Sequence, residues 1–182
     1  MNENGTIAAA FLRVAKRICA RSKKEGGRPV MERLVVRGGK AYASDGAVVI
    51  RVADTGSTAT GYLDPKPLAA AKPVEFFEKS GGMNVKQGET FTHHKRPEGD
   101  DFPDIEKIFP QFDGPRAHCH EPFFVDPVIL IDALDIFDKK GDRPRVQIYL
   151  PEENDGKTPL VIVGTVDGKD ARAILLPLKV QK

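Results

Sequence analysis

Histidine and cysteine side chains form the first candidate for chemistry in this sequence, because both residue types are ligands of zinc. The candidate ligands are His93, His94, His118, Cys119 and His120. A segment that contains prolines and aspartates separates the first two from the other three, and neither group has the spacing of a known zinc motif. We therefore expect no metal, and place these side chains at strand ends and in loops.

Aspartates form the second candidate, since Asp100, Asp101 and Asp104 could bind a divalent ion or act as an acid–base pair. Asp104 stands before a short turn and is suited to cap it, which is the interpretation that we favour. The sequence contains no glycine-rich phosphate loop, no nucleophile elbow and no defensible Cys–His pair. We expect a protein that is not an enzyme and has no cofactor, with an enzyme that uses these clusters as the remaining alternative.

Composition limits the class of protein. The chain has 182 residues, of which 40% are hydrophobic and 30% charged, as in a soluble globular protein of one large or two small domains. Its net charge of +2 does not by itself predict a nucleic-acid partner. Cys19 and Cys119 lie far apart and no signal-peptide pattern precedes them, which predicts reduced thiols and a cytoplasmic protein. No apolar run approaches the roughly 20 residues of a membrane helix.

A basic amphipathic helix is predicted near the start, with Thr6 as its N-cap and Gly26 at its end. Apolar residues recur there at helical spacing: Ile7, Phe11, Val14, Ala15 and Ile18. Basic residues fall on the remaining arc of the helix, broadly opposite this stripe: Arg13, Lys16, Arg17, Arg21, Lys23 and Lys24. A solvated helix face usually mixes charges of both signs, so this face favours phosphate binding, with an ordinary solvated face as the alternative.

The same order of elements, helix and then strands, occurs three times along the chain. Helices are predicted from Thr6, over 67–79 and over 128–137. Strands are predicted over 31–36, 40–52, 61–63, 83–86, 89–94, 122–125, 145–150, 160–165 and 171–179. This order predicts an α+β protein with three repeats of low mutual identity.

The segment 102–110 begins with Phe-Pro and ends with Phe-Pro. Proline holds both ends extended, while Ile105, Ile108 and Phe109 have the spacing of one apolar helical turn. The pattern indicates a packed crossover between two structured units. An ordinary loop with a hydrophobic anchor remains the alternative.

Three short motifs, taken together, resemble the bacterial sliding clamp, the β subunit of the replicative DNA polymerase. Residues 43–49 (Ala-Ser-Asp-Gly-Ala-Val-Val) resemble the Ala-Thr-Asp-Gly-His-Arg-Leu turn of the clamp, and 102–110 resemble its Phe-Pro-Asp-Tyr crossover. Residues 173–179 (Ala-Ile-Leu-Leu-Pro-Leu-Lys) resemble its C-terminal Val-Met-Pro-Met-Arg. The motifs stand in the order of the family, and the resemblance spans nearly the whole chain.

The resemblance implies a DNA-clamp-like fold, with three helix-plus-antiparallel-strand repeats and the helices on one face of the sheets. Residues 1–110 would form one complete domain from the repeats 6–55 and 60–110. Residues 111–120 would be a linker, and 121–182 would form half of a second domain. The ring of the family has twelve such repeats, so four copies of this chain would close one, and we expect a homo-oligomer.

The resemblance also implies a processivity factor that associates with duplex DNA without reading its sequence, because the helices of the family face the DNA backbone. The implied phosphate ligands are Arg13, Lys16, Arg17, Arg21 and Lys24. The third predicted helix carries Asp132, Asp135 and Asp138, which suit a DNA channel poorly. A clamp-fold adaptor or regulator that binds replication proteins without encircling DNA is therefore the alternative.

A peptide-binding pocket for polymerases or repair proteins is the second implied site. Its walls would be Met31, Ser44, Gly46, Val49, Pro103, Ile108, Ile174, Leu176, Pro177 and Leu178. These residues are small or apolar, as a peptide pocket requires, although each would also suit an ordinary core. Ala47 and Val48 replace the His-Arg of the family turn, which leaves the specificity for partners open.

Overall fold

The computed structural model describes residues 4–24, 28–69, 71–79, 81–98, 101–107, 125–137, 145–150 and 158–176. This part of the chain contains two α-helices, two 3-10 helices and eleven strands, and the strands form two antiparallel sheets. This arrangement confirms the predicted α+β class. None of these helices is long and apolar enough to cross a membrane. The elements are β1 (Gly5–Ile7), α1 (Ala9–Lys24), η1 (Pro29–Glu32), β2 (Leu34–Arg37), β3 (Lys40–Ser44), β4 (Val48–Val52), β5 (Gly61–Leu63), β6 (Val74–Lys79), β7 (Gly82–Gln87), β8 (Thr90–Lys95), η2 (Ile105–Lys107), α2 (Pro127–Asp135), β9 (Gln147–Tyr149), β10 (Leu160–Val166) and β11 (Lys169–Leu175).

Helix α1 forms as its sequence predicts, because its apolar stripe is buried completely. Phe11, Val14 and Ile18 have no exposed surface, and burial of each large apolar side chain stabilises the fold by roughly 1.5–3 kcal/mol. The predicted start at Thr6 was wrong, since Thr6 lies in strand β1 and the helix begins at Ala9. Ile7 is nevertheless buried in the same core as the helix.

The helix predicted over 67–79 was wrong. The described residues between β5 and β6 form turns, and strand β6 follows directly after Pro73. Val74 and Phe76 are buried whereas Glu75 is exposed, so burial alternates with the period of a strand rather than of a helix. The second predicted repeat therefore has strands but no α-helix in the described part of the chain, whereas its strands β7 and β8 lie where they were predicted.

The first two repeats exchange one short strand each. Strand β1 leaves the first repeat to pair with β6, and β5 leaves the second repeat to pair with β2. Both short strands begin with glycine, and in both a side chain at that position would collide with the core. A Cβ on Gly5 would lie 2.1 Å from the Phe76 ring, and one on Gly61 would lie 2.3 Å from Met83. The exchange thus joins the two repeats through close packing.

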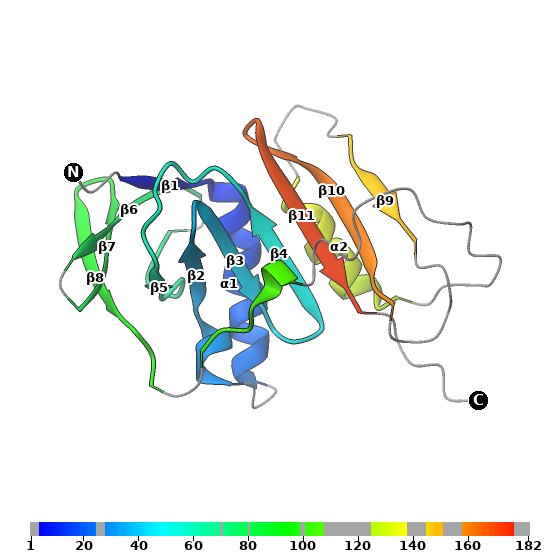
Figure 1. Ribbon diagram of the computed structural model, residues 1–182, viewed down its shortest axis with the longest axis horizontal. Helices are drawn as coiled ribbons and strands as arrows, with labels where there is room; N and C mark the ends of the chain where they lie inside the picture. Colours follow the sequence, from blue (N-terminus) through cyan, green and yellow to red (C-terminus); the bar gives the residue numbers. More distant parts are fainter. Residues whose placement is uncertain are drawn as a thin grey trace.

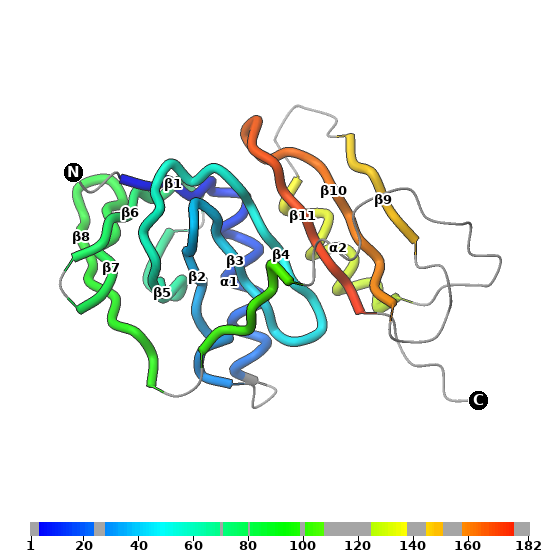
Figure 2. Tube along the Cα trace, in the orientation of Figure 1, coloured from blue at the N-terminus to red at the C-terminus, as the bar shows by residue number. Residues whose placement is uncertain are grey.

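The larger sheet joins residues from both ends of the chain. Its seven strands have the order β5-β2-β3-β4-β11-β10-β9, with β4 and β11 paired over five residues of each. Figure 2 shows the red strand β11 beside the cyan strand β4. The boundaries predicted between 110 and 121 fall outside the described residues.

Both α-helices lie on one face of this sheet, as predicted (Figure 1). Helix α2 begins at Pro127, after Asp126 has capped it by accepting a hydrogen bond from the Val128 N–H at 2.8 Å. Ala133 and Ile136 are fully buried in the core that also contains the apolar stripe of α1. The two helices therefore share one core with the sheet.

A second apolar cluster covers the opposite face of the sheet, where the crossover packs. Phe102 and Ile105 are almost fully buried there beside Tyr42 of β3 and Ile174 of β11. The described part of the crossover contains one 3-10 turn, η2, close to the predicted helical turn. Ile108, Phe109 and Pro110 lie outside the described residues.

Candidate docking groove and basic helix face

An apolar groove of about 230 Å³ lies on the face of the sheet opposite the helices. Its lining contains seven of the ten predicted pocket residues: Met31, Ser44, Gly46, Val49, Pro103, Ile174 and Leu176. The sequence did not predict its other lining residues, Ala47, Ile105 and Pro159. The remaining predicted residues, Ile108, Pro177 and Leu178, lie outside the described part of the chain. In the sheet, Val49 pairs with both Ser44 and Ile174, which places these three residues in one row.

The first wall of the groove is the tight turn between β3 and β4. Asp45 Oδ1 accepts hydrogen bonds from the N–H groups of Ala47 and Val48, both at 3.0 Å. Gly46 has a φ of +97°, a conformation that favours glycine. Leu176 from the opposite wall donates its N–H to the Ala47 carbonyl at 3.0 Å. Hydrogen bonds therefore fix both the turn and its attachment to the end of β11.

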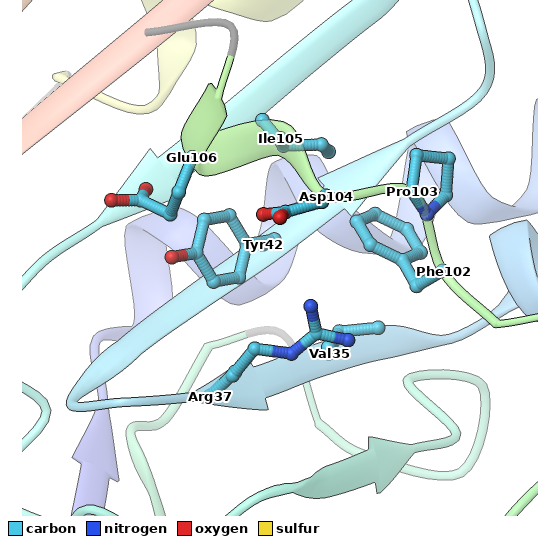
Figure 3. A pocket seen from close by; sticks show the side chains of 8 residues that line it. All are labelled: Val35, Arg37, Tyr42, Phe102, Pro103, Asp104, Ile105 and Glu106. Carbon is cyan, nitrogen blue, oxygen red and sulfur yellow. The ribbon is translucent and has the colours of Figure 1, made fainter. Parts of the chain in front are cut away.

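The crossover forms the second wall, and Glu106 fixes it to the sheet. The Glu106 carboxylate binds Lys40 Nζ, and it accepts a hydrogen bond from Arg51 Nη1 at 3.1 Å. Figure 3 shows the Tyr42 hydroxyl near the same carboxylate. Burial acts to raise the pKa of Glu106, but Lys40, Arg51 and the Tyr42 hydroxyl outweigh it and hold this pKa below its ordinary value.

Arg51 connects the crossover to the strand on the other side of the groove. Its side chain is only 7% exposed, and its Nη2 lies 3.0 Å from Asp170 Oδ2 on β11. Because the same guanidinium also binds Glu106, one buried arginine holds both β11 and the crossover. Arg51 lies two residues beyond Val49 on β4, so both side chains point to the groove side of the sheet.

The predicted phosphate ligands on α1 divide into two sets. Arg17 and Arg21 face helix α2. Arg17 Nε lies 2.7 Å from Asp132 Oδ1 and its Nη2 lies 2.6 Å from Asp135 Oδ2. Arg21 Nη1 lies 2.7 Å from Asp132 Oδ2, and its Nε donates to Asp45 Oδ2 at 2.5 Å. Carboxylates of the protein thus already bind both guanidinium groups.

Lys16 faces the other side of α1. Its Nζ donates to the carbonyls of Lys66 and Leu68 at 3.1 and 2.6 Å. It borders a second, more polar groove of about 440 Å³, which Lys23, Arg33 and Lys66 also line together with the carboxylates of Glu32 and Asp64. Arg13 is partly buried, and the side chain of Lys24 lies outside the description.

Each of the described histidines has a hydrogen-bonding partner within the protein. His94 is buried, and its Nδ1 accepts a hydrogen bond from the Asp64 N–H at 2.9 Å. His93 is exposed and lies 2.8 Å from Asn84 Oδ1. No group of three possible ligands that could hold a metal occurs among the described residues, which exclude His118, Cys119 and His120.

The described aspartates of the second candidate also have protein partners. Asp101 binds Arg96 and accepts a hydrogen bond from the Tyr62 hydroxyl at 3.3 Å. The Asp104 carboxylate lies 3.2 Å from Lys107 Nζ, and the Asp104 carbonyl accepts the Lys107 N–H that closes the turn. The main chain of Asp104 therefore takes part in the predicted turn. Asp100 lies outside the described residues.

No protein-family model matches the sequence, and no curated protein matches it significantly. The fold is similar to solved bacterial clamps. It aligns with the DNA polymerase sliding clamp from Pseudomonas aeruginosa at 14% identity and a TM-score of 0.55, over 98% of this chain and 67% of the clamp. The H. pylori β clamp in complex with diflunisal gives 11% identity and a TM-score of 0.63, over 98% and 66%. The DNA polymerase III β chain from Streptococcus pneumoniae gives 12% and 0.57, over 97% and 65%.

At such identities the similarity shows the fold alone. The chain spans about two thirds of the length of these clamps. The similarity therefore agrees with the clamp-like fold that the three sequence motifs implied.

Proposed function

We propose that this protein is a sliding-clamp-like docking protein, whose apolar groove binds short peptides of DNA polymerases or repair proteins. The observation that carries the proposal is the groove itself. Three separate segments, the β3–β4 turn, the crossover and the end of β11, bring apolar side chains together there. Its described lining residues include no charged residue. Typical ligand pockets measure roughly 300–1,000 Å³, so this smaller groove suits a few apolar side chains of a peptide.

The exposed residue Leu176 allows a direct test of peptide binding. Leu176 is 47% exposed, so Leu176→Asp places a charge in the groove without disturbing the core. We expect the affinity for a fluorescent peptide from the clamp-contacting segment of a bacterial polymerase to fall at least tenfold, measured by anisotropy. Ile148→Asp is the matched control, because Ile148 is 48% exposed on β9 and lies outside the groove. An equal loss in both variants would exclude the groove as the binding site.

The sliding-clamp form of this function adds association with duplex DNA as a homo-oligomer, without catalysis or cofactor, in the cytoplasm. Support comes from the clamp-like fold and from the cations of α1 and of the neighbouring polar groove, Lys16, Lys23, Arg33 and Lys66. Each phosphate contact that is lost lowers the salt slope of DNA binding by about 0.9. We therefore expect the double variant Arg13→Gln/Lys16→Gln to lower this slope by about 2.

A topological assay tests whether a ring forms. A closed ring is retained on nicked circular plasmid and released when the plasmid is linearised, whereas a protein bound only to phosphates is released equally from both. Light scattering of the same sample gives the number of copies. Four copies with selective release on linearisation would support the sliding clamp, and equal release would contradict it.

The adaptor form, which binds replication proteins without encircling DNA, is favoured by one specific observation. Asp45, Asp132 and Asp135 bind Arg17 and Arg21 and so reduce the positive charge that α1 can offer to phosphates. The adaptor form predicts that the peptide binds with full affinity while plasmid binding is weak and independent of topology. The two assays above therefore separate the two forms.

A further inference from the structure

The ion pair between Arg21 and Asp45 connects the two faces of the sheet. Arg21 belongs to α1, which lies behind the sheet in Figure 1, whereas the crossover lies in front of it. Asp45 belongs to the turn that lines the groove with Ser44, Gly46 and Ala47. Asp45 Oδ2 accepts a hydrogen bond from Arg21 Nε at 2.5 Å, while its Oδ1 holds the N–H groups of the turn. A single carboxylate therefore contacts both the helix and the turn.

Arg21 is itself held in place from its other end. Its Nη1 lies 2.7 Å from Asp132 Oδ2, and Asp132 also binds Arg17. The side chains of Asp45 and Asp132 are only 1% and 8% exposed, so solvent cannot replace the arginine as their partner. Burial acts to lower the pKa of Arg21, but its hydrogen bonds to Asp132 and Asp45 outweigh this and raise it. The guanidinium is thus a fixed cation between two buried carboxylates.

Loss of this cation would act on the groove through Asp45. A buried carboxylate that loses its charge partner becomes protonated or turns toward solvent, because an unpaired buried charge is strongly unfavourable. In either case Asp45 would hold the N–H groups of Ala47 and Val48 less well. The Ala47 carbonyl also binds the Leu176 N–H, so a shift of the turn would reach the opposite wall.

We propose that Arg21 is a positioning residue for the docking groove, which acts from the opposite face of the sheet by fixing Asp45 and, through Asp45, the turn that lines the groove. The inference rests on the proposed peptide binding and adds to it a dependence on a residue that is not part of the groove lining. Arg21, which the sequence resemblance assigns to DNA, thereby acquires a role in peptide binding.

Two methionine variants test this role. Arg21→Met and Arg17→Met each replace a long cation with a long apolar side chain, and each removes an ion pair with Asp132. Of these two arginines, only Arg21 is paired with Asp45. We expect Arg21→Met to weaken peptide binding roughly tenfold and Arg17→Met to weaken it less than twofold. Affinity that is equal to wild type in Arg21→Met would overturn the inference.

A rescue experiment separates positioning from a general loss of stability. Asn at position 45 keeps an oxygen that accepts the N–H groups of the turn but carries no charge. Asp45→Asn should therefore restore at least half of the lost affinity when combined with Arg21→Met. Arg21→Lys is a milder variant in case the methionine variant does not fold. One ammonium cannot bridge Asp45 and Asp132 as the guanidinium does, so the affinity should fall about threefold.

Hydrogen exchange provides a readout that does not depend on any peptide. The amide protons of Ala47 and Val48, both bound by Asp45, should exchange at least fivefold faster in Arg21→Met and at the wild-type rate in Arg17→Met. Unchanged exchange in both variants would overturn the inference even if the peptide binds. Faster exchange in Arg21→Met alone, in a protein that binds no peptide, would support the role of Arg21 in fixing the turn and contradict the proposed function instead.

Discussion

Individual polar residues determine the shape of the groove, and the sequence shows only part of what each of them does. Asp45 was predicted as a turn residue and Arg21 as a phosphate ligand, but no pattern in the sequence links them. They meet because α1 packs against β3 and so brings Arg21 to the end of that strand. The roles of Glu106 and Arg51 were missed for the same reason. Each of these side chains has partners that lie far away in the sequence.

Replacement of Glu106 should weaken the attachment of the crossover to the sheet. Glu106→Gln keeps the size of the side chain but removes the charge that binds Lys40 and Arg51. Glu106 and Lys40 are partly solvated although Arg51 is buried, so we expect a loss of about 1 kcal/mol in the free energy of unfolding, together with a two- to fivefold loss of peptide affinity. Urea denaturation and anisotropy measure the two effects, with the exposed Glu98→Gln as control. A variant that matches wild type in both would show that Glu106 does not hold the crossover.

The same residue predicts a dependence on pH. The pKa of Glu106 lies below its ordinary value of 4.5 in the folded protein, so the folded state binds a proton less readily than the unfolded state. Its stabilising effect is complete above about pH 4.5 and is lost as the pH falls through the lower, folded pKa. Wild type and Glu106→Gln should therefore converge in stability in acid. A difference that persists at the lowest pH would contradict this.

Protonation of His94 should also destabilise the fold, and at a higher pH than protonation of Glu106. Burial lowers the pKa of His94. The nearby negative charge of Asp64 opposes this shift, whereas the positive charge of Arg33 adds to it. Its Nδ1 must also stay unprotonated to accept the Asp64 N–H. The unfolded chain therefore binds a proton first, and stability should fall as the pH drops below about 6.5. His94→Gln should reduce this slope, measured by urea denaturation between pH 7 and 5. Exposed His93→Gln should have a smaller effect, because the charge of His93 contributes least to the shift of His94.

At the scale of elements, the sequence predicts a helix or strand correctly where apolar residues repeat with one period over several turns. The prediction fails where the repeat is too short to distinguish a helix from a strand. The apolar stripe of α1 repeats over several turns, and the structure buries it as predicted. Over 67–79 Pro73 interrupts the apolar residues, and Val74 and Phe76 fit a strand as well as a helix. Seven of the residues that the resemblance implied for a pocket lie together in the groove lining, because the turn, the crossover and the last strand were recognised by resemblance. The sequence could not show the pairing of β4 with β11, which sets the distance between the groove walls.

Strand β1 depends on the absence of a side chain at its first residue. In Gly5→Ala the new Cβ would overlap the fully buried ring of Phe76, so we expect destabilisation by roughly 1–3 kcal/mol in urea denaturation. Thr6→Ala, at an exposed position of the same strand, should have a much smaller effect. Phe76→Leu should lower the free energy of unfolding less in the Gly5→Ala background than in wild type, because the smaller leucine makes room for the methyl group of the new alanine. Strictly additive effects would show that the two positions do not compete for space.

At the scale of the whole molecule, one sheet and one core join the two ends of the chain. The main apolar cluster contains residues of α1, α2, β6 and β11. We therefore expect a single cooperative unfolding transition, with a calorimetric enthalpy equal to the van't Hoff enthalpy. Two separated transitions would show that residues before 110 and after 121 unfold as independent units.

The exchange of β1 and β5 between the first two repeats also has a consequence for how the protein is made. Strand β1 leaves the ribosome before its partner β6, which is synthesised only after α1 and β2–β5. Neither sheet can therefore be completed while the first repeat alone has emerged, and β1 must wait for a contact that closes a long loop. We expect the nascent chain to keep open strand edges during this interval, which favours aggregation until β6 has emerged.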